Sequence, residues 1–136
     1  MALALDTTAL LARYLGGPAQ AVVRDAMAAD QDWCASALAL SEALMLVDRI
    51  AEDRVTRTAL RRAVRDDWDR IHVVPVDALA LDRATELGRT QPLKTVDALH
   101  LAAADRLPRP VRYATFDPNQ IPVALSLGFD VVSTHS

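Results

Sequence analysis

The chain has 136 residues, of which 51% are hydrophobic and 24% are charged, and its formal net charge is −3. This length and composition predict one globular domain over residues 1–136 and exclude a disordered chain. The single cysteine excludes both an intramolecular disulfide and a multi-cysteine zinc site. Because the average charge is acidic, a nucleic-acid-binding function would need a locally basic surface.

The apolar amino-terminal segment does not have the pattern of a secretory signal, because no basic residue precedes it and Asp6 interrupts it. No segment reaches the roughly 18 consecutive apolar residues that a membrane-spanning helix requires. We therefore expect a cytoplasmic protein with no membrane partner.

Short apolar runs alternate with longer helical patterns along the chain. Buried strands are predicted over residues 2–5, 33–35, 72–76, 111–116 and 129–132. Helices are predicted over residues 7–14, 18–29, 37–51, 56–70, 78–87, 95–106 and 118–127. Ser36, Thr56 and Asp77 are interpreted as N-caps, and Pro75 indicates that the third strand lies at an edge of the sheet.

This alternation predicts an α/β fold, with helices on both faces of a central sheet. The result would be a three-layer α/β/α domain around a five-stranded, mainly parallel sheet. In such sheets, ligands bind beyond the carboxyl ends of the strands. The residues that follow each strand are therefore the first place to look for a functional site.

Four acidic residues have positions that would bring them to this end of the sheet. Asp6 directly follows the first strand, and Asp117 follows the fourth. Glu42 and Asp97 lie in the nearly apolar stretches 38–47 and 95–104, with few basic residues nearby in the sequence. A lone carboxylate on an apolar helix face is costly to desolvate unless a positive group pairs with it. One divalent cation shared by all four acids would remove that cost.

Each acid also has a purely structural interpretation. Asp6 and Asp117 stand where aspartate commonly caps a helix, and Pro118 favours this interpretation for Asp117. Asp77 also lies between a strand and a helix, and nothing in its surroundings suggests a second role. It is therefore a useful comparison for the other acids.

Clustered carboxylates are the ligands that hard cations such as Mg²⁺ and Mn²⁺ prefer. With one cysteine and three histidines in the chain, zinc is disfavoured. A hard cation held in this way polarises a phosphoryl oxygen and promotes hydrolysis of a phosphodiester.

Four segments resemble the motifs of PIN domains, and specifically those of the bacterial VapC toxins. Residues 5–11 (LDTTALL) are similar to the family's opening strand, aspartate and Ser/Thr, and residues 39–43 (ALSEA) resemble its second acidic motif. Residues 95–104 (TVDALHLAAA) resemble the third motif, and residues 114–117 (ATFD) resemble the fourth. The order and spacing of the motifs fit the family over essentially the whole chain.

The resemblance implies a sheet in the order 3-2-1-4-5 and an endoribonuclease that depends on Mg²⁺, with Mn²⁺ as a substitute. Asp6 and Asp97 would be the firmest metal ligands of the catalytic set. Glu42 and Asp117 would complete it, binding the metal directly or through water.

Supporting roles follow from the same resemblance. Thr8 and Thr115 would orient the acids through their hydroxyls, and Asn119 would contact the substrate or the water around the ion. His100 lies one turn after Asp97, where a packing or supporting role is favoured over that of a general base.

The resemblance also implies three partners, namely an RNA substrate, a cognate antitoxin and a second copy of the chain in a homodimer. The protein would then be the toxin of a type II toxin–antitoxin pair. Arg57, Arg61 and Arg65 recur at every fourth position and form one basic stripe on a helix. The stripe is either a solvated face paired with nearby acids or a track for RNA phosphates.

A non-catalytic PIN-like module that binds RNA or protein remains the main alternative. A phosphoacceptor signalling domain fits less well, because it expects paired acids after the first strand and a lysine near the last. Here Asp6 stands alone, and Lys94 precedes a helix. A haloacid-dehalogenase-like phosphatase would need a second acid two residues after the first, where this chain has Thr8.

Overall fold

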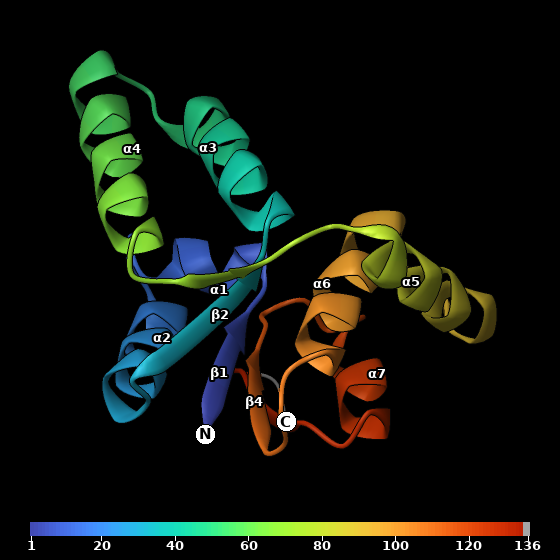
Figure 1. Cartoon of the computed structure of the whole chain (residues 1–136). Coiled ribbons are helices and arrows are strands. Elements are labelled where there is room, and N and C mark those ends of the chain that lie inside the picture. Colours follow the sequence, from blue (N-terminus) through green and yellow to red (C-terminus); the bar gives the residue numbers. More distant parts are fainter. Residues whose placement is uncertain (135–136) are drawn as a thin grey trace.

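Strands and helices alternate along the chain, as the hydrophobic pattern predicts. The structure, a computed structural model, describes residues 1–134 (Figure 1). The five strands in this range are β1 (Ala2–Leu5), β2 (Asp32–Ser36), β3 (His72–Val74), β4 (Val111–Ala114) and β5 (Asp130–Val132). The seven helices of the same residues are α1 (Thr7–Ala12), α2 (Pro18–Ala29), α3 (Leu38–Ile50), α4 (Arg54–Trp68), α5 (Ala78–Thr90), α6 (Thr95–Asp105) and α7 (Ile121–Ser126).

The strands form one sheet in the order β3-β2-β1-β4-β5, and every pair is parallel. This confirms the predicted fold class and strand order. β3 lies at an edge and ends at Val74, directly before Pro75, which lacks the N–H that a further ladder bond would need. In the centre, Leu5 of β1 is level with Ala35 of β2 and Ala114 of β4.

The sheet separates two hydrophobic cores, because alternate residues of a strand face opposite sides. Leu3 and Leu5 of β1 pack with α1, α2, α3 and α4, whereas Ala4 packs with α5, α6 and α7. Figure 1 shows these two groups of helices on opposite sides of the sheet. The three predicted layers are therefore present, with α1–α4 in one outer layer and α5–α7 in the other.

Two predicted N-caps are wrong, one by three residues and the other by one. Asp53, not Thr56, caps α4, and its carboxylate accepts hydrogen bonds from both the N–H (2.7 Å) and the hydroxyl (3.0 Å) of Thr56. A carboxylate is a stronger acceptor than a hydroxyl, so the acid takes the capping position. Ser36 ends β2 and Ala37 precedes α3, although the Ser36 hydroxyl still accepts a hydrogen bond from the Leu38 N–H (3.3 Å).

The segment after β4 also differs from the prediction. Helix α7 begins at Ile121, not at Pro118, because residues 117–120 form a turn in which the Asp117 carbonyl accepts a hydrogen bond from the Gln120 N–H (3.1 Å). This turn brings the side chain of Gln120 within hydrogen-bond distance of Asp6, which follows β1.

Within residues 1–134, no helix combines the length and the hydropathy needed to cross a bilayer.

Candidate active site

The site lies where the central strands β1 and β4 end. Because Leu5 and Ala114 are level in the sheet, the residues that follow them are neighbours, and the Asp6 N–H donates to the Ala114 carbonyl (3.2 Å). The parallel register thus brings the first and fourth motifs together from opposite ends of the sequence.

Asp6 is the most buried acid of the site, with 0% of its surface exposed. Its Oδ1 accepts hydrogen bonds from the Thr8 hydroxyl (2.7 Å) and the Ala9 N–H (2.8 Å). Its Oδ2 accepts hydrogen bonds from the Thr115 hydroxyl (2.7 Å) and the Gln120 amide (3.1 Å). Burial raises the pKa of Asp6, while the hydrogen bonds from Thr115, Ala9 and Thr8 act in the opposite direction.

Asp97 and Asp117 lie beside this buried acid and are partly exposed. Asp97 is in the first turn of α6, and its Oδ1 accepts a hydrogen bond from the same Gln120 amide (3.1 Å). The Oδ1 of Asp117 accepts a hydrogen bond from the Asn119 N–H (2.9 Å). Desolvation and the negative charge of Asp117 together raise the pKa of Asp97. The two acids are therefore close enough to repel each other.

Gln120 connects the acids and was not predicted from the sequence. Its side chain is 1% exposed, and its Oε1 accepts a hydrogen bond from the Tyr113 hydroxyl (2.6 Å). No sequence pattern marks this residue, because a single glutamine near a turn is unremarkable. Asn119, which was predicted to contact the substrate or the water around the ion, is exposed, and its backbone N–H donates to Asp117.

Glu42 belongs to a second cluster that adjoins the first. Its Oε1 is hydrogen-bonded to the Thr7 hydroxyl and lies 2.7 Å from the His100 Nε2. The hydrogen bond with His100 is the main cause of a lowered pKa at Glu42. Few basic residues lie near Glu42 in the sequence, but α6 supplies His100 as a hydrogen-bond partner from 58 residues away.

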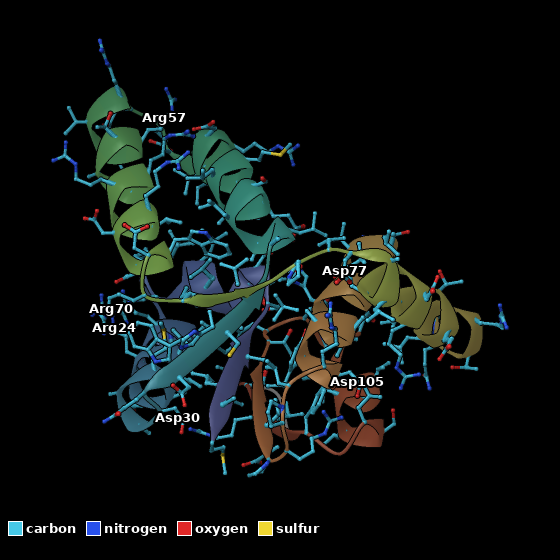
Figure 2. All side chains as sticks on the ribbon, in the orientation of Figure 1. Arg24, Asp30, Arg57, Arg70, Asp77 and Asp105 are labelled. Carbon is cyan, nitrogen blue, oxygen red and sulfur yellow. The ribbon has the colours of Figure 1, made fainter. Side chains whose placement is uncertain are left out.

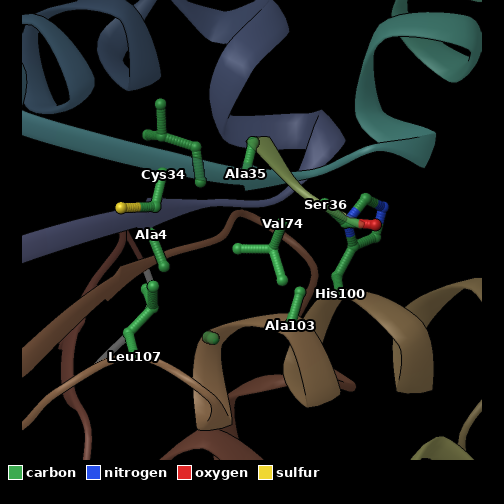
Figure 3. A pocket seen from close by; sticks show the side chains of 10 residues that line it. Ala4, Cys34, Ala35, Ser36, Val74, His100, Ala103 and Leu107 are labelled. Atoms are coloured by element: carbon green, nitrogen blue, oxygen red, sulfur yellow. The ribbon is translucent and has the colours of Figure 1, made fainter. Parts of the chain in front are cut away.

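His100 joins this cluster to the interior between the sheet and α6. Figure 3 shows His100 and Ser36 at one end of a narrow crevice whose other lining residues are mostly apolar and include Cys34 and Ala103. The crevice has no room for a water molecule, and the His100 Nδ1 is buried without a hydrogen-bond partner. The ring is therefore oriented through Nε2, toward Glu42 and Thr7 (3.0 Å).

The oxygen ligands of Asp6, Asp97 and Asp117 suit a hard divalent cation in their chemistry. No arginine, lysine or histidine in residues 1–134 forms an ion pair with any of them. As they stand, however, no three acidic, histidine or cysteine side chains of the described residues surround a common point at metal-binding distance. Asp6 and Asp97 are instead linked by Gln120, whose side-chain amide donates a hydrogen bond to each of them.

The predicted basic stripe lies on α4. Arg61 forms an ion pair with Asp48 of α3 (2.9 Å), and Arg57 donates to the Ala51 carbonyl (3.4 Å). Figure 2 shows Arg57 between these two helices, while Arg65 is exposed. At least two of the three arginines therefore help to hold α3 and α4 together.

Several solved structures have a fold similar to that of this chain. A toxin-antitoxin complex from Klebsiella pneumoniae has a chain that aligns with a TM-score of 0.66 at 18% identity, covering 86% of this chain and 87% of that one. FitAcB from Neisseria gonorrhoeae aligns with a TM-score of 0.71 at 17% identity, covering 97% and 96%. FitAB bound to an IR36 DNA fragment aligns with a TM-score of 0.69 at 16% identity, covering 98% and 94%.

At such identities these structures establish the fold alone. Among curated proteins, none matches the chain. The profile of the PIN domain, however, matches residues 3–134, which include all four acidic motifs and nearly the entire chain. The chain belongs to the PIN-domain family.

Proposed function

We propose that this protein is a Mg²⁺- or Mn²⁺-dependent endoribonuclease and the toxin of a type II toxin–antitoxin pair. The observation that carries the proposal is the group formed by Asp6, Asp97 and Asp117 at the carboxyl end of the sheet. Three carboxylates lie near one another here, one of them fully buried, and no basic side chain of the described residues is paired with them. A divalent cation is the partner that best offsets their desolvation and repulsion.

The residues around the acids have distinct tasks in this proposal. A bound divalent cation supplies Lewis acidity toward a phosphoryl oxygen and makes water more acidic. Thr8 and Thr115 hold the Asp6 carboxylate in one orientation through hydrogen bonds of 2.7 Å each. Asp97 and Asp117 are partly exposed, so a cation that they held would be accessible to an RNA phosphate approaching from solvent.

Glu42 takes part through its position beside the main group. It is tied to Thr7, the neighbour of Asp6, and to His100, one turn after Asp97. We infer that it completes the ligand set directly or through water, because these two side chains engage its Oε1 and leave its Oε2 without a hydrogen bond from residues 1–134.

Protein partners are proposed from the family and from the exposed apolar residues. The similar structures include a toxin-antitoxin complex by name, and we infer that this chain also binds a cognate antitoxin and a second copy of itself. The exposed large apolar side chains include Met45 and Ile50 on α3 and Leu79 and Leu81 on α5. Exposed apolar side chains of this kind favour protein contacts.

The first test is cleavage of RNA by the purified protein with Mn²⁺, Mg²⁺ or EDTA. We expect cleavage only with a divalent cation, and a loss of at least about 100-fold in rate for Asp6→Asn and Asp97→Asn, with folding checked by circular dichroism. Sequencing of the RNA ends from cells that briefly express the protein would then identify the target.

Asp77→Asn is the matched control, since it makes the same chemical change at another acid that caps a helix. Asp77 lies at the start of α5 (Figure 2), accepts a hydrogen bond from the Ala80 N–H (3.0 Å) and pairs with Arg106 (2.8 Å). This variant should keep the wild-type rate. A folded wild type that neither cleaves RNA nor binds Mn²⁺ would instead favour the non-catalytic binding module.

A further inference from the structure

Gln120 is placed so that one side-chain amide contacts two carboxylates. Its Nε2 lies 3.1 Å from Asp6 Oδ2 and 3.1 Å from Asp97 Oδ1. The orientation of the amide follows from its partners, because ionised carboxylates only accept hydrogen bonds while the Tyr113 hydroxyl donates to Oε1 (2.6 Å). Each of the two N–H groups therefore points to a different acid.

The acceptor positions of Asp6 are already filled. A carboxylate has about four lone-pair positions, and Asp6 receives four hydrogen bonds, from Thr8, Ala9, Thr115 and Gln120. For Asp6 to bind a cation, one of these donors has to withdraw. The bond from Gln120 is the longest of the four.

The surroundings of the other donors make them harder to displace. Ala9 donates from the backbone of α1, where the bond also caps the helix. Thr8 is held from its other side, since its hydroxyl accepts a hydrogen bond from the Phe116 N–H (2.9 Å). Thr115 is held likewise, because its hydroxyl accepts a hydrogen bond from the Asp117 N–H (3.1 Å). Among residues 1–134, Gln120 is the one donor that contacts both Asp6 and Asp97.

We propose that the Gln120 amide substitutes for the cation in the ion-free protein, linking Asp6 to Asp97 through two hydrogen bonds that are given up when a divalent ion binds. This inference rests on the proposed function, because it presupposes that these acids bind a cation. Gln120 is accordingly a positioning residue that keeps the acids together at the carboxyl end of the sheet before the ion arrives.

The proposal has a thermodynamic consequence that a purely structural role lacks. A contact present only in the ion-free state stabilises that state and therefore weakens ion binding by the same factor. If Gln120 contributed equally with and without the ion, its removal would lower stability under both conditions and leave the affinity for the ion unchanged.

The test compares Gln120→Met with the wild type, since methionine has a similar length and no N–H donor. We expect the Kd for Mn²⁺, measured by isothermal titration calorimetry at pH 7, to fall about tenfold in the variant. The thermal midpoint should fall in EDTA, and most of this loss should disappear in saturating Mn²⁺.

Tyr113→Phe is the control, because it removes a buried hydrogen bond of Gln120 and leaves both bonds to the acids. Its Kd for Mn²⁺ should stay within about twofold of the wild-type value, and its loss of stability should be similar with and without Mn²⁺.

Each other outcome has a definite meaning. An unchanged or higher Kd in Gln120→Met would overturn the proposal, as would a variant that stays unfolded in both EDTA and Mn²⁺. A variant that is unfolded in EDTA and folds on addition of Mn²⁺ would support it. If the wild type itself shows no binding of Mn²⁺, the proposed function fails first, and the inference fails with it.

Discussion

Asp6 fills two roles that the sequence presents as alternatives. Its Oδ1 caps α1 through the Ala9 N–H, in the same way that Asp77 caps α5 through Ala80. Its Oδ2 faces Thr115 and Gln120, and this second oxygen is what distinguishes it from Asp77. A helix cap and a ligand are therefore compatible in one residue, because a carboxylate has two oxygens on separate sides.

Burial of Asp97, together with repulsion from Asp117, leads to a prediction about the pH dependence of stability. The pKa of Asp97 is raised, so the folded protein binds a proton at this carboxylate more tightly than the unfolded chain does. In EDTA, the stability of the wild type should therefore decrease as the pH rises from the ordinary value of 3.8 through the raised pKa.

Asp97→Asn removes this effect and keeps the Oδ1 acceptor for Gln120. In EDTA at pH 7, the variant should melt about 2–5 °C above the wild type, and the difference should shrink as the pH is lowered toward 4. The measurement is a thermal melt followed by circular dichroism at several pH values. A variant that melts below the wild type at pH 7 would show that Asp97 is stabilised by a contact other than those described.

At the scale of elements, α4 has a single side chain that is fully buried in the core. Val64 is its one buried residue, at 0% exposure, whereas Val55 is 80% exposed at its first turn. Val64→Ala should lower the free energy of unfolding by about 1–3 kcal/mol, because it leaves a cavity against the core beneath α1 and α3.

Val55→Ala makes the same chemical change on the same helix and provides the comparison. It should alter the free energy of unfolding by less than about 0.5 kcal/mol, since the side chain is already in contact with solvent. Urea denaturation followed by circular dichroism measures both values. Equal losses for the two variants would contradict the assignment of Val64 as the anchor of α4.

At the scale of the whole molecule, Glu42 and His100 join the two helical layers. Glu42 lies on α3, which belongs to the layer of α1–α4, and His100 lies on α6 in the opposite layer. Their contact passes beyond the carboxyl end of the sheet, so it fixes the position of one layer relative to the other at the site.

A double-mutant cycle of Glu42→Gln and His100→Leu tests this link. In ion-free buffer at pH 7, we expect a coupling free energy of about 1 kcal/mol, which is modest because Glu42 is one-third exposed and solvent screens the pair. Urea denaturation of the wild type, both single variants and the double variant gives the value. Effects that add within about 0.3 kcal/mol would indicate that the contact does not couple the layers.

The sequence by itself determined the pattern of strands and helices, the strand order through its family resemblance, and the positions of Asp6 and Asp117 after their strands. These features depend on local hydrophobic periodicity and on motifs a few residues long. The motifs also include Asp97 and Glu42, and the structure places both near the end of β1.

Only the tertiary structure decided which groups surround these acids. Gln120 meets Asp6 across 114 residues of sequence, and His100 meets Glu42 across 58. Neither contact can be recognised from the local sequence. A polar side chain is compatible with an exposed position as well as a buried one, and only the folded chain shows which it occupies. The partners of a buried charge are determined by tertiary packing. Here that packing occurs at the ends of parallel strands, where segments remote in sequence lie close together.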